Sequence, residues 1–329
     1  MIDIRKNPNA PLEKKNILEN WKKYLGIESY SPEFKVPLYV DEKNERAKPL
    51  GIKIDEFVSQ PNFEKLIQDF TKFGDENGLT RIGEMIVPKD KDYELKESYL
   101  DGWTLKKEVV GPDFIDYALI KEVREEKRAT PLEWREKIKN AFLEAFNAKP
   151  KNLPKVYLES AKEDKFRNQI DFIIENVNKD FENYGLEKPE SDFEELYLIT
   201  IEKDDNDERI PIGAIELIKM PNGIWEYSIG IIKGYCGKRY GESALVELIK
   251  MLKEEKEKGN ADIKYLYGDI MNIPSGKALA RACKKVGIEK EDISFGFHEL
   301  QGNMFSISMG YEKRIRDGYI DTFAVYVKI

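Results

Sequence analysis

The chain has 329 residues, of which 41% are hydrophobic and 35% charged, and its formal net charge is −8. This length allows two ordinary domains, each with its own apolar core. Residues 1–150 contain 27 Lys and Arg against 29 Asp and Glu, and residues 151–329 contain 27 against 33, so nucleic acid is not an expected partner.

Cysteine and histidine are scarce. Only Cys236 and Cys283 could form a disulfide, no secretory leader is recognised, and no apolar run approaches the roughly 20 residues of a membrane span. We therefore expect a cytoplasmic protein that does not bind a membrane. His298 is the single histidine, which argues against most metal centres and His-containing triads, so no metal is expected.

The first half of the chain predicts an α+β domain of unknown role. Apolar spacing indicates helices near Ile17–Leu25 and Phe63–Phe70. β-Branched and apolar runs indicate strands at Arg81–Val87 and Tyr117–Val123. A capping box at residues 130–133 then begins an amphipathic helix that closes this half.

A linker is predicted at residues 148–154, where two prolines stand in a polar setting. It divides the chain into residues 1–150 and 151–329. In the second half, periodicity predicts helices at residues 166–181, 240–252 and 275–286. It predicts strands at residues 156–159, 196–202, 210–220, 224–232, 263–270 and 319–329, with a hairpin turn at 221–223. Hairpins first and helical connections later indicate a mixed, mostly antiparallel sheet flanked by helices.

The most informative segment is Gly234–Leu245, which leads from the strand ending at Ile232 into the helix that follows. Three glycines within eight residues permit a tight turn. The first amides of the new helix have no partner within it, and they and the helix dipole favour phosphate. This segment is an anion-binding candidate.

The order of these elements, this loop and Asn272-Ile273-Pro274-Ser275 resemble the GNAT superfamily of acyl-CoA-dependent N-acetyltransferases. The ending at residues 310–321 is similar to the branch that acetylates the N-termini of ribosomal proteins. The resemblance covers about residues 153–329. It implies a GNAT-type fold for that part, acetyl-CoA as the acetyl donor, and direct transfer to a primary amine.

The resemblance also implies a cofactor site. In the family the strand before the loop, here Ile231 and Ile232, runs alongside the pantetheine arm. The loop then holds the pyrophosphate, and Asn272 and Ser275 match positions near the thioester end; an ordinary helix start with Ser275 as cap is the alternative. The loop residues are Gly237, Lys238, Arg239, Tyr240, Gly241 and Glu242. Cys236 and Arg239 depart from the family motif, which prefers Arg or Gln and then glycine, and Arg239 could itself reach a phosphate.

For catalysis the resemblance favours Glu226 as the general base, since family members often place a carboxylate on this strand; a solvent-facing glutamate is the alternative. The family's usual tyrosine acid is missing from residues 275–286. Substitutes by residue type are Tyr311, Tyr267 and Tyr227, and Ser275 or a water molecule could also serve.

Residues 288–303 are interpreted as an insertion at the mouth of the site, with His298 as a structural residue or a second base. Cys236 beside the loop is either a tolerated small residue or a nucleophile. Cys283, on an apolar helix face, is expected in the core.

Two functions follow. The first is an N-acetyltransferase acting on a peptide N-terminus, a lysine or a small cationic amine; the second is a non-catalytic acyl-CoA-binding module for recognition or regulation. For residues 1–150, a degenerate GNAT copy and an unrelated substrate- or partner-binding domain are the two interpretations. The sequence does not indicate the oligomeric state.

Overall fold

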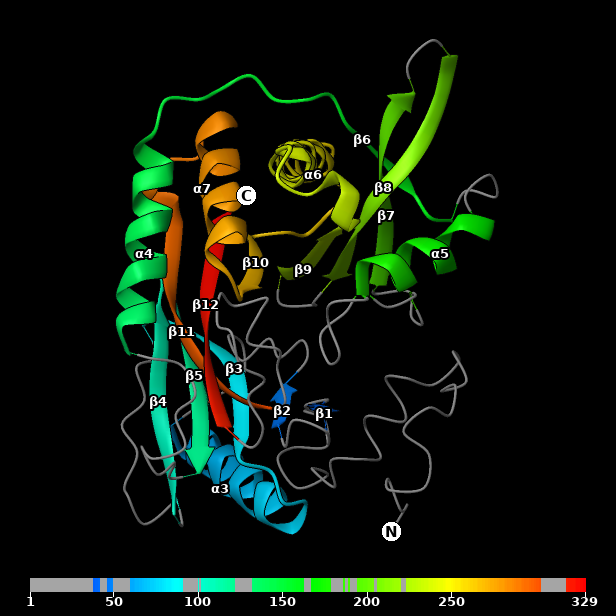
Figure 1. The fold of residues 1–329 in the computed structure, drawn as a ribbon. Coiled ribbons are helices and arrows are strands. Elements are labelled where there is room, and N and C mark those ends of the chain that lie inside the picture. Colours follow the sequence, from blue (N-terminus) through cyan, green and yellow to red (C-terminus); the bar gives the residue numbers. More distant parts are fainter. Residues whose placement is uncertain are drawn as a thin grey trace.

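The structure is a computed structural model of the chain. It describes residues 38–41, 46–49, 60–90, 100, 102–121, 132–162, 167–178, 186, 189, 194–203, 206–219, 223–302 and 318–329. In these ranges two sheets and their helices form a mixed α+β architecture, which confirms the predicted fold class (Figure 1).

The larger sheet has seven strands in the order β11-β12-β10-β9-β8-β7-β6. All neighbouring pairs are antiparallel except β9 and β10, which are parallel. The strands are β6 (Tyr157–Ser160), β7 (Glu194–Lys203), β8 (Asn206–Lys219), β9 (Ile224–Ile231), β10 (Tyr265–Ile270), β11 (Ile293–Gly302) and β12 (Gly318–Lys328). The strands predicted from residue 156 onward are confirmed, with ends that shift by a few residues.

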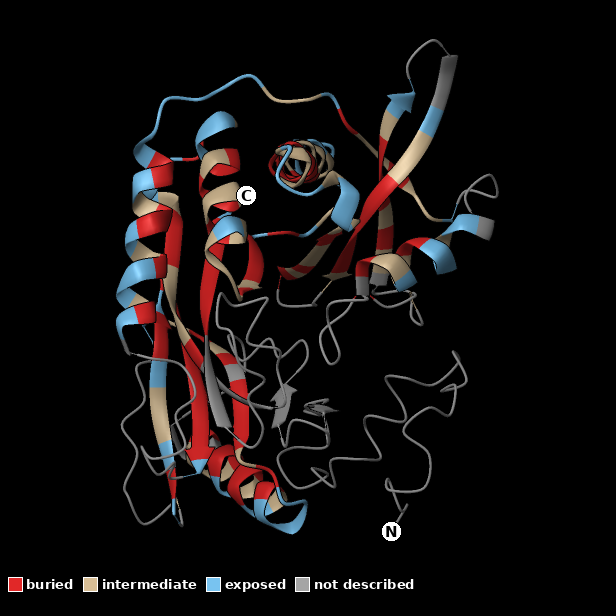
Figure 2. Ribbon diagram, viewed as in Figure 1, coloured by how far each residue is buried: buried red, intermediate tan, exposed pale blue. Residues whose placement is uncertain are grey.

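Three helices cover one face of this sheet: α4 (Leu132–Asn147), α6 (Tyr240–Glu257) and α7 (Ile273–Lys285). Their buried sides point toward the sheet and their exposed sides away from it (Figure 2). The apolar side chains that predicted α6 pack on this face: Leu245, Leu248 and Ile249 are buried beside residues of β9 and β10. This face holds the largest apolar core of the described residues.

Helix α5 (Arg167–Asn178) packs on the opposite face, against β8 and β9. Its Ile173 and Val177 are buried with Leu196, Leu198 and Ala214. A β-carbon at Gly230 would lie 2.0 Å from Val177 Cγ1, which is too close. Glycine is therefore required where this helix crosses β9.

The smaller sheet has the order β1-β2-β3-β5-β4 and carries α3 (Gln60–Glu76). Its strands are β1 (Leu38–Asp41), β2 (Arg46–Pro49), β3 (Arg81–Pro88), β4 (Trp103–Val110) and β5 (Phe114–Lys121). The predicted helix at Phe63–Phe70 and the strand at Arg81–Val87 are confirmed, whereas β4 was not predicted. The predicted helix at Ile17–Leu25 and the capping residues Thr130 and Pro131 lie outside the described residues.

The two sheets meet at β4 and β5 on one side and β10 to β12 on the other. Val109 and Phe114 of the smaller sheet are buried with Tyr265, Tyr267 and Tyr326 of the larger. A β-carbon at Gly296 in β11 would lie 2.0 Å from the carbonyl oxygen of Glu108 in β4. The backbones of β4 and β11 are therefore in close contact, which any other residue at position 296 would disturb.

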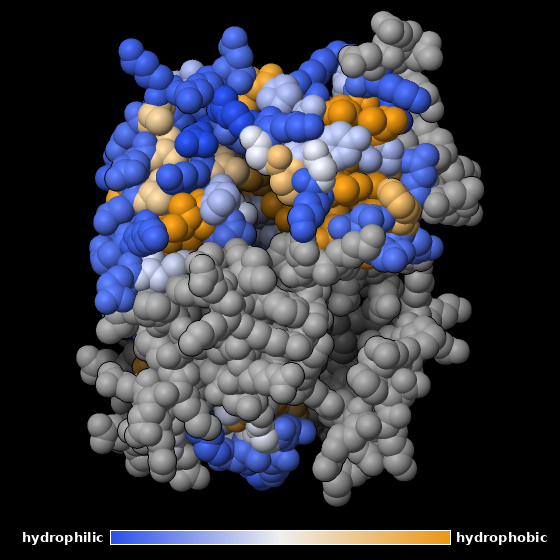
Figure 3. Space-filling view, in the orientation of Figure 1, coloured by the Kyte–Doolittle hydropathy of each residue, from blue (hydrophilic) through white to orange (hydrophobic). Residues whose placement is uncertain are grey.

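Helix α4 precedes the predicted boundary at residue 150 but packs against α7 and β12 of the larger sheet. From its end the linker passes over α7 and α6 to reach β6 (Figure 1). Hydrophilic side chains predominate over the described part of the face in Figure 3, with hydrophobic ones in small groups between them. Among the described residues, no helix combines the length and apolarity of a membrane span.

Candidate functional site

The parallel strands β9 and β10 pair at only three positions, where Ile224–Glu226 lies opposite Tyr265–Tyr267. Past this point β9 stays paired with β8 up to Ile231, and β10 stays paired with β12 up to Ile270. The two strands therefore diverge toward their carboxyl ends, at the place where the glycine loop begins.

The diverging end of β9 directs backbone polar groups toward β10. Ile232 N donates to Ile212 O of β8 at 2.9 Å, so by the alternation of an antiparallel ladder the N–H groups of Ile229 and Ile231 face the other way. The thiol of Cys236 contacts Ile231 O, with a separation of 3.4 Å between sulfur and oxygen. An extended chain that carries amides could bind along this edge as an added strand does.

The loop after β9 ends at an uncapped helix start. Gly237 has φ +77° and Arg239 has φ +67°, which turn the chain into α6. The first helical bond runs from Ser243 N to Arg239 O at 3.0 Å, and the side chain of Arg239 does not cap the helix. The amides of Tyr240, Gly241 and Glu242 precede that bond, so they and the helix dipole are available to an anion.

Space beside these amides depends on Gly241. A β-carbon there would have only Ile231 Cγ1 within 4 Å, at 3.8 Å. Alanine fits such a position, while a large side chain would project over the strand end that carries Ile231. Of the residues predicted to bind cofactor, Ile231, Ile232 and Gly237–Glu242 lie in the segment that ends β9 and begins α6, whereas Asn272 and Ser275 lie at the start of α7. Their role stays a prediction.

Arg239 points toward the linker and its own helix. Its Nε and Nη2 donate to Glu242 at 3.0 and 2.6 Å, and its Nη1 donates to Asn152 O at 3.0 Å. Each nitrogen of the guanidinium thus has an acceptor within the chain. The alternative that Arg239 reaches a phosphate would require it to leave or share these partners.

Helix α7 begins differently, across the divergence. Asn272 is its N-cap, because Asn272 Oδ1 accepts a hydrogen bond of 2.8 Å from Ser275 N. The alternative in which Ser275 is the N-cap is therefore wrong. The N-cap is Asn272, and the backbone amide of Ser275 donates to it. Both residues lie just beyond the end of β10, where the resemblance places the thioester end.

Glu226 lies where the two strands begin to separate. It is half-buried and opposite Tyr267 in β10. Strand alternation puts it on the face of Ile224, which packs toward the smaller sheet. On that face α5 packs on β8 and β9, and the smaller sheet packs on β10 to β12. Glu226 therefore lies between α5 and the smaller sheet.

The proposed substitutes for the missing acid are placed as follows. Tyr267 is buried on the face of Glu226, and Tyr227 is buried on the helix face, with its ring against Gly268. Burial raises the pKa of Tyr227 above its usual value. Tyr311 lies outside the described residues.

The interpretation of residues 288–303 as an insertion is wrong. Residues 293–302 are strand β11, which pairs with β12 along its whole length. Ile293, Phe295 and Phe297 alternate with smaller or polar residues, a strand pattern that the preceding acidic run obscured. His298 is consequently not in a loop but completely buried, between the two sheets.

His298 connects carboxylates from both halves of the chain. Its Nε2 lies 2.9 Å from Asp116 Oδ2 of β5, and its Nδ1 lies 3.1 Å from Asp269 Oδ1 of β10 and 3.1 Å from the Tyr267 hydroxyl. The Tyr326 hydroxyl donates to Asp116 at 2.7 Å and the Thr322 hydroxyl to Asp269 at 2.8 Å. We call these residues the His298 network.

A second buried ion pair adjoins this network. Arg81 Nη1 and Nη2 donate to the two oxygens of Glu108 at 2.8 and 2.6 Å, and both side chains are almost fully buried. Glu108 Oε2 is also 3.8 Å from His298 Nε2. Among the described residues, no group of three or more His, Cys, Asp and Glu side chains is arranged to hold a metal ion.

The groups of the His298 network shift one another's pKa values. Burial alone would lower the pKa of His298, but the carboxylates of Asp269, Glu108 and Asp116 raise it well above the usual value. Burial raises the pKa of Asp116, while His298 opposes this effect. Burial also acts to raise the pKa of Asp269, yet the attraction of His298 holds it below its usual range. These shifts favour the imidazolium form of His298 and the ionised form of Asp269.

The roles of Asp116 and Asp269 were not predicted from the sequence, although a signal existed. Asp116 interrupts the apolar run Phe114–Ile120, and Asp269 interrupts Tyr265–Ile270. A carboxylate inside an apolar strand requires a partner. The partner, His298, is 182 residues from Asp116, so the pairing could not be predicted from spacing.

The two cysteines are not joined. Cys283 is fully buried, as predicted, and burial raises the pKa of its thiol to about 12. Cys236 is exposed at the glycine loop. A nucleophilic role for it stays a prediction.

No protein family model and no curated protein matches the chain. Among solved structures, it is similar to the spermidine N-acetyltransferase from Vibrio cholerae in complex with CoA and spermine, with 17% identity and a TM-score of 0.32 over 53% of this chain and 95% of that one. A domain from Methanocaldococcus jannaschii DSM 2661 has 13% identity and a TM-score of 0.32, over 53% and 99%. At these values neither similarity decides the function.

Proposed function

We propose that the chain is an acyl-CoA-dependent N-acetyltransferase that transfers an acetyl group directly to a primary amine. The observation that carries the proposal is the divergence of β9 and β10, with the uncapped start of α6 directly after β9. An extended arm would bind along the edge of β9, and the amides of Tyr240–Glu242 would hold its pyrophosphate. Acetyl-CoA, when bound, supplies an electrophilic thioester carbonyl.

The acceptor would approach from the face that carries Glu226. We assign Glu226 as the general base that takes a proton from the acceptor's ammonium group, because an amine attacks only when it is unprotonated. Asp269, held ionised on the same face with its side chain 18% exposed, adds negative potential there. This charge favours a cationic acceptor: a peptide N-terminus, a lysine or a small polyamine.

Asn272 and Ser275 are assigned to the thioester end. Because the side chain of Asn272 already caps α7, we expect it to fix the position of this helix start. The hydroxyl of Ser275, which is half-buried, remains the candidate that protonates the leaving thiolate, together with Tyr311 or water. The similarity to the ribosomal-protein branch makes a protein N-terminus the first acceptor to test.

A non-catalytic acyl-CoA-binding module is the second candidate function. It is favoured by the absence of a tyrosine from residues 273–285 of α7 and by the engagement of Arg239 with Glu242 and Asn152. Such a protein would bind acetyl-CoA through the same loop without turning it over.

One experiment separates the two. Binding of acetyl-CoA to the full chain is measured by isothermal titration calorimetry. Release of CoA is then followed with a thiol reagent in the presence of peptides, lysine derivatives and polyamines. Binding with turnover supports the transferase, and binding without turnover on any acceptor supports the module. Absence of binding would overturn both.

Gly241 provides the matched variants. Gly241→Ala should bind acetyl-CoA as the parent does, because its β-carbon has room. Gly241→Trp should weaken binding by about tenfold or more, since the side chain crowds the amides and the end of β9. Equal binding by both variants would place the ligand elsewhere.

A further inference from the structure

Arg239 connects three parts of the chain. Its guanidinium pairs with Glu242 through two hydrogen bonds and reaches Asn152 O in the linker through a third. Arg281 of α7 lies 3.8 Å from the same carboxylate. Arg239 thereby links the start of α6 to the linker, and Glu242 links it to α7.

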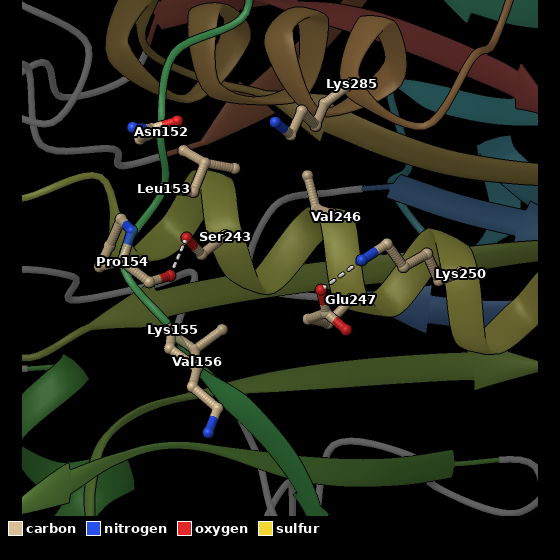
Figure 4. A pocket seen from close by; sticks show the side chains of 10 residues that line it. All are labelled: Asn152, Leu153, Pro154, Lys155, Val156, Ser243, Val246, Glu247, Lys250 and Lys285. Carbon is tan, nitrogen blue, oxygen red and sulfur yellow. Dashed lines mark hydrogen bonds and ion pairs between the residues drawn. The ribbon is translucent and has the colours of Figure 1, made fainter.

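The linker has a second attachment next to the first. The Ser243 hydroxyl donates to Pro154 O at 2.7 Å (Figure 4). The carbonyls of residues 152 and 154 are thus both fixed to the first turn of α6. Leu153 packs on the apolar core between them, and Val156 is buried in it. The linker is attached to the helix start that carries the anion-binding amides.

Glu242 creates an electrostatic problem at that place. Its side chain is 5% exposed, and it belongs to the same helical turn as the amides of Tyr240 and Gly241. An uncompensated carboxylate there would repel a phosphate. Arg239 neutralises it at hydrogen-bond distance, and Arg281 adds a weaker contribution from α7.

The backbone of Arg239 also indicates that this contact matters. Among the described residues it is the only one other than glycine with a positive φ, at 67°. A non-glycine residue in this region is unfavourable relative to glycine. Arg239 nevertheless adopts this backbone conformation, and in it the side chain forms three hydrogen bonds.

We propose that Arg239 is a positioning residue, not a phosphate ligand: it clamps residues 152–154 to α6 and neutralises Glu242 beside the amides. The part of this proposal that concerns phosphate rests on the proposed function. The clamp itself does not, because it joins only groups of this chain.

The clamp is tested without any ligand. Amide hydrogen exchange is compared over residues 157–160 of β6, which directly follow the clamped linker and pair with β7, in the parent protein, Arg239→Gly and Ser243→Ala. Glycine suits the φ of residue 239, so Arg239→Gly is expected to fold. Both variants should speed exchange in this segment by about tenfold or more, and exchange in α4 serves as the internal control. Unchanged exchange in Arg239→Gly would overturn the clamp.

The charge role is tested with CoA itself. Arg239→Gly should weaken CoA binding by about tenfold, because Glu242 loses its closest partner. The double variant Arg239→Gly/Glu242→Gln should recover to within about threefold of the parent, since the repelling charge has been removed as well. Calorimetric titration at two salt concentrations measures both.

The two roles predict opposite results for the double variant. If Arg239 binds phosphate directly, the double variant binds no better than Arg239→Gly, and both lose part of the salt dependence of the parent. That result would overturn the positioning role. If the parent does not bind CoA, the proposed function fails, while the exchange experiment still decides the clamp.

Discussion

The two faces of the seven-stranded sheet are covered by different kinds of side-chain contact. Toward α4, α6 and α7 the contact is almost wholly aliphatic and aromatic, with Ile138, Leu248 and Phe323 completely buried. Toward the smaller sheet, the aromatic residues of the junction surround His298, Asp116 and Asp269. The helix face is packed with apolar side chains, whereas the opposite face combines apolar contacts with a buried group of charged side chains.

The two kinds of contact hold the halves of the chain together in different ways. Apolar contacts are non-directional and tolerate exchange of side chains of similar volume. The contacts of His298 with Asp116 and Asp269 depend on distance and direction, so they constrain how the strands that carry these residues are placed. We infer that the His298 network fixes the position of β5 relative to β10 and β12 of the other sheet, while the helix face supplies most of the apolar stabilisation.

The largest expected effect is that of His298→Ala. It leaves the buried Asp116 and the partly buried Asp269 without their histidine partner, so the free energy of unfolding should fall by about 3–5 kcal/mol. Urea denaturation measures it. Ile249→Val, equally buried on the helix face, is the control and should cost about 0.5–1.5 kcal/mol. A loss below that of the control would mean that the charges contribute little to joining the sheets.

Next in size is Glu226→Gln, which removes the proposed base from the charged face. We expect kcat to fall by about 100-fold, since general-base catalysis contributes about 10²–10⁴-fold. Binding of acetyl-CoA should be unchanged, because the ligand contacts are assigned to the loop and to the edge of β9. Steady-state kinetics and calorimetry separate the two quantities. An unchanged kcat would remove Glu226 from the mechanism.

A smaller effect distinguishes two buried tyrosines, one on each face. Tyr326→Phe removes the hydroxyl that donates to Asp116 at 2.7 Å, and it should cost about 1.5–3 kcal/mol. The hydroxyl of Tyr227 has no hydrogen bond recorded within the described ranges, so Tyr227→Phe should change stability by less than about 0.5 kcal/mol. Thermal or urea unfolding of both variants gives the comparison. Equal effects would contradict the distinction between the faces.

The helix face was largely predictable from the sequence. Ala244, Leu245, Leu248 and Ile249 recur at helical spacing, and the structure buries all four. The glycine loop was likewise located from local chemistry, because glycine and helix-start signals act within a few residues. These features depend on short stretches of chain.

The charged face was not predictable in the same way. Residues 288–303 were interpreted as an insertion, and the alternation of Ile293, Phe295 and Phe297 around His298 was missed. Its partners Asp116 and Asp269 are distant in sequence, and only the packing of the two sheets brings them together. The role of Arg239 was also left open. Its partner in the linker is the backbone carbonyl of Asn152, and every residue type has such a carbonyl, so the sequence gives no sign of this contact.

The stability of the protein should depend on pH through His298. A histidine whose pKa is raised on folding contributes full stability below its unfolded pKa, near 6.5, and loses this contribution as pH rises through the folded pKa. Stability should therefore decrease above about pH 6.5, with a slope of up to about 1.4 kcal/mol per pH unit. Asp116, whose pKa burial raises, acts in the same direction from lower pH, and Asp269, whose pKa is lowered, loses its contribution only in acid.

The neighbouring groups require a difference measurement. Arg81, Glu108, Tyr267 and Tyr326 also surround the imidazole, so the pH profile of the parent alone does not isolate it. His298→Gln keeps a polar side chain without the titration. Urea unfolding of both proteins from pH 6 to 9 should show a decline in the parent that is reduced in the variant. Parallel profiles would mean that His298 is neutral between its two carboxylates, and the charged face would then be held by hydrogen bonds alone.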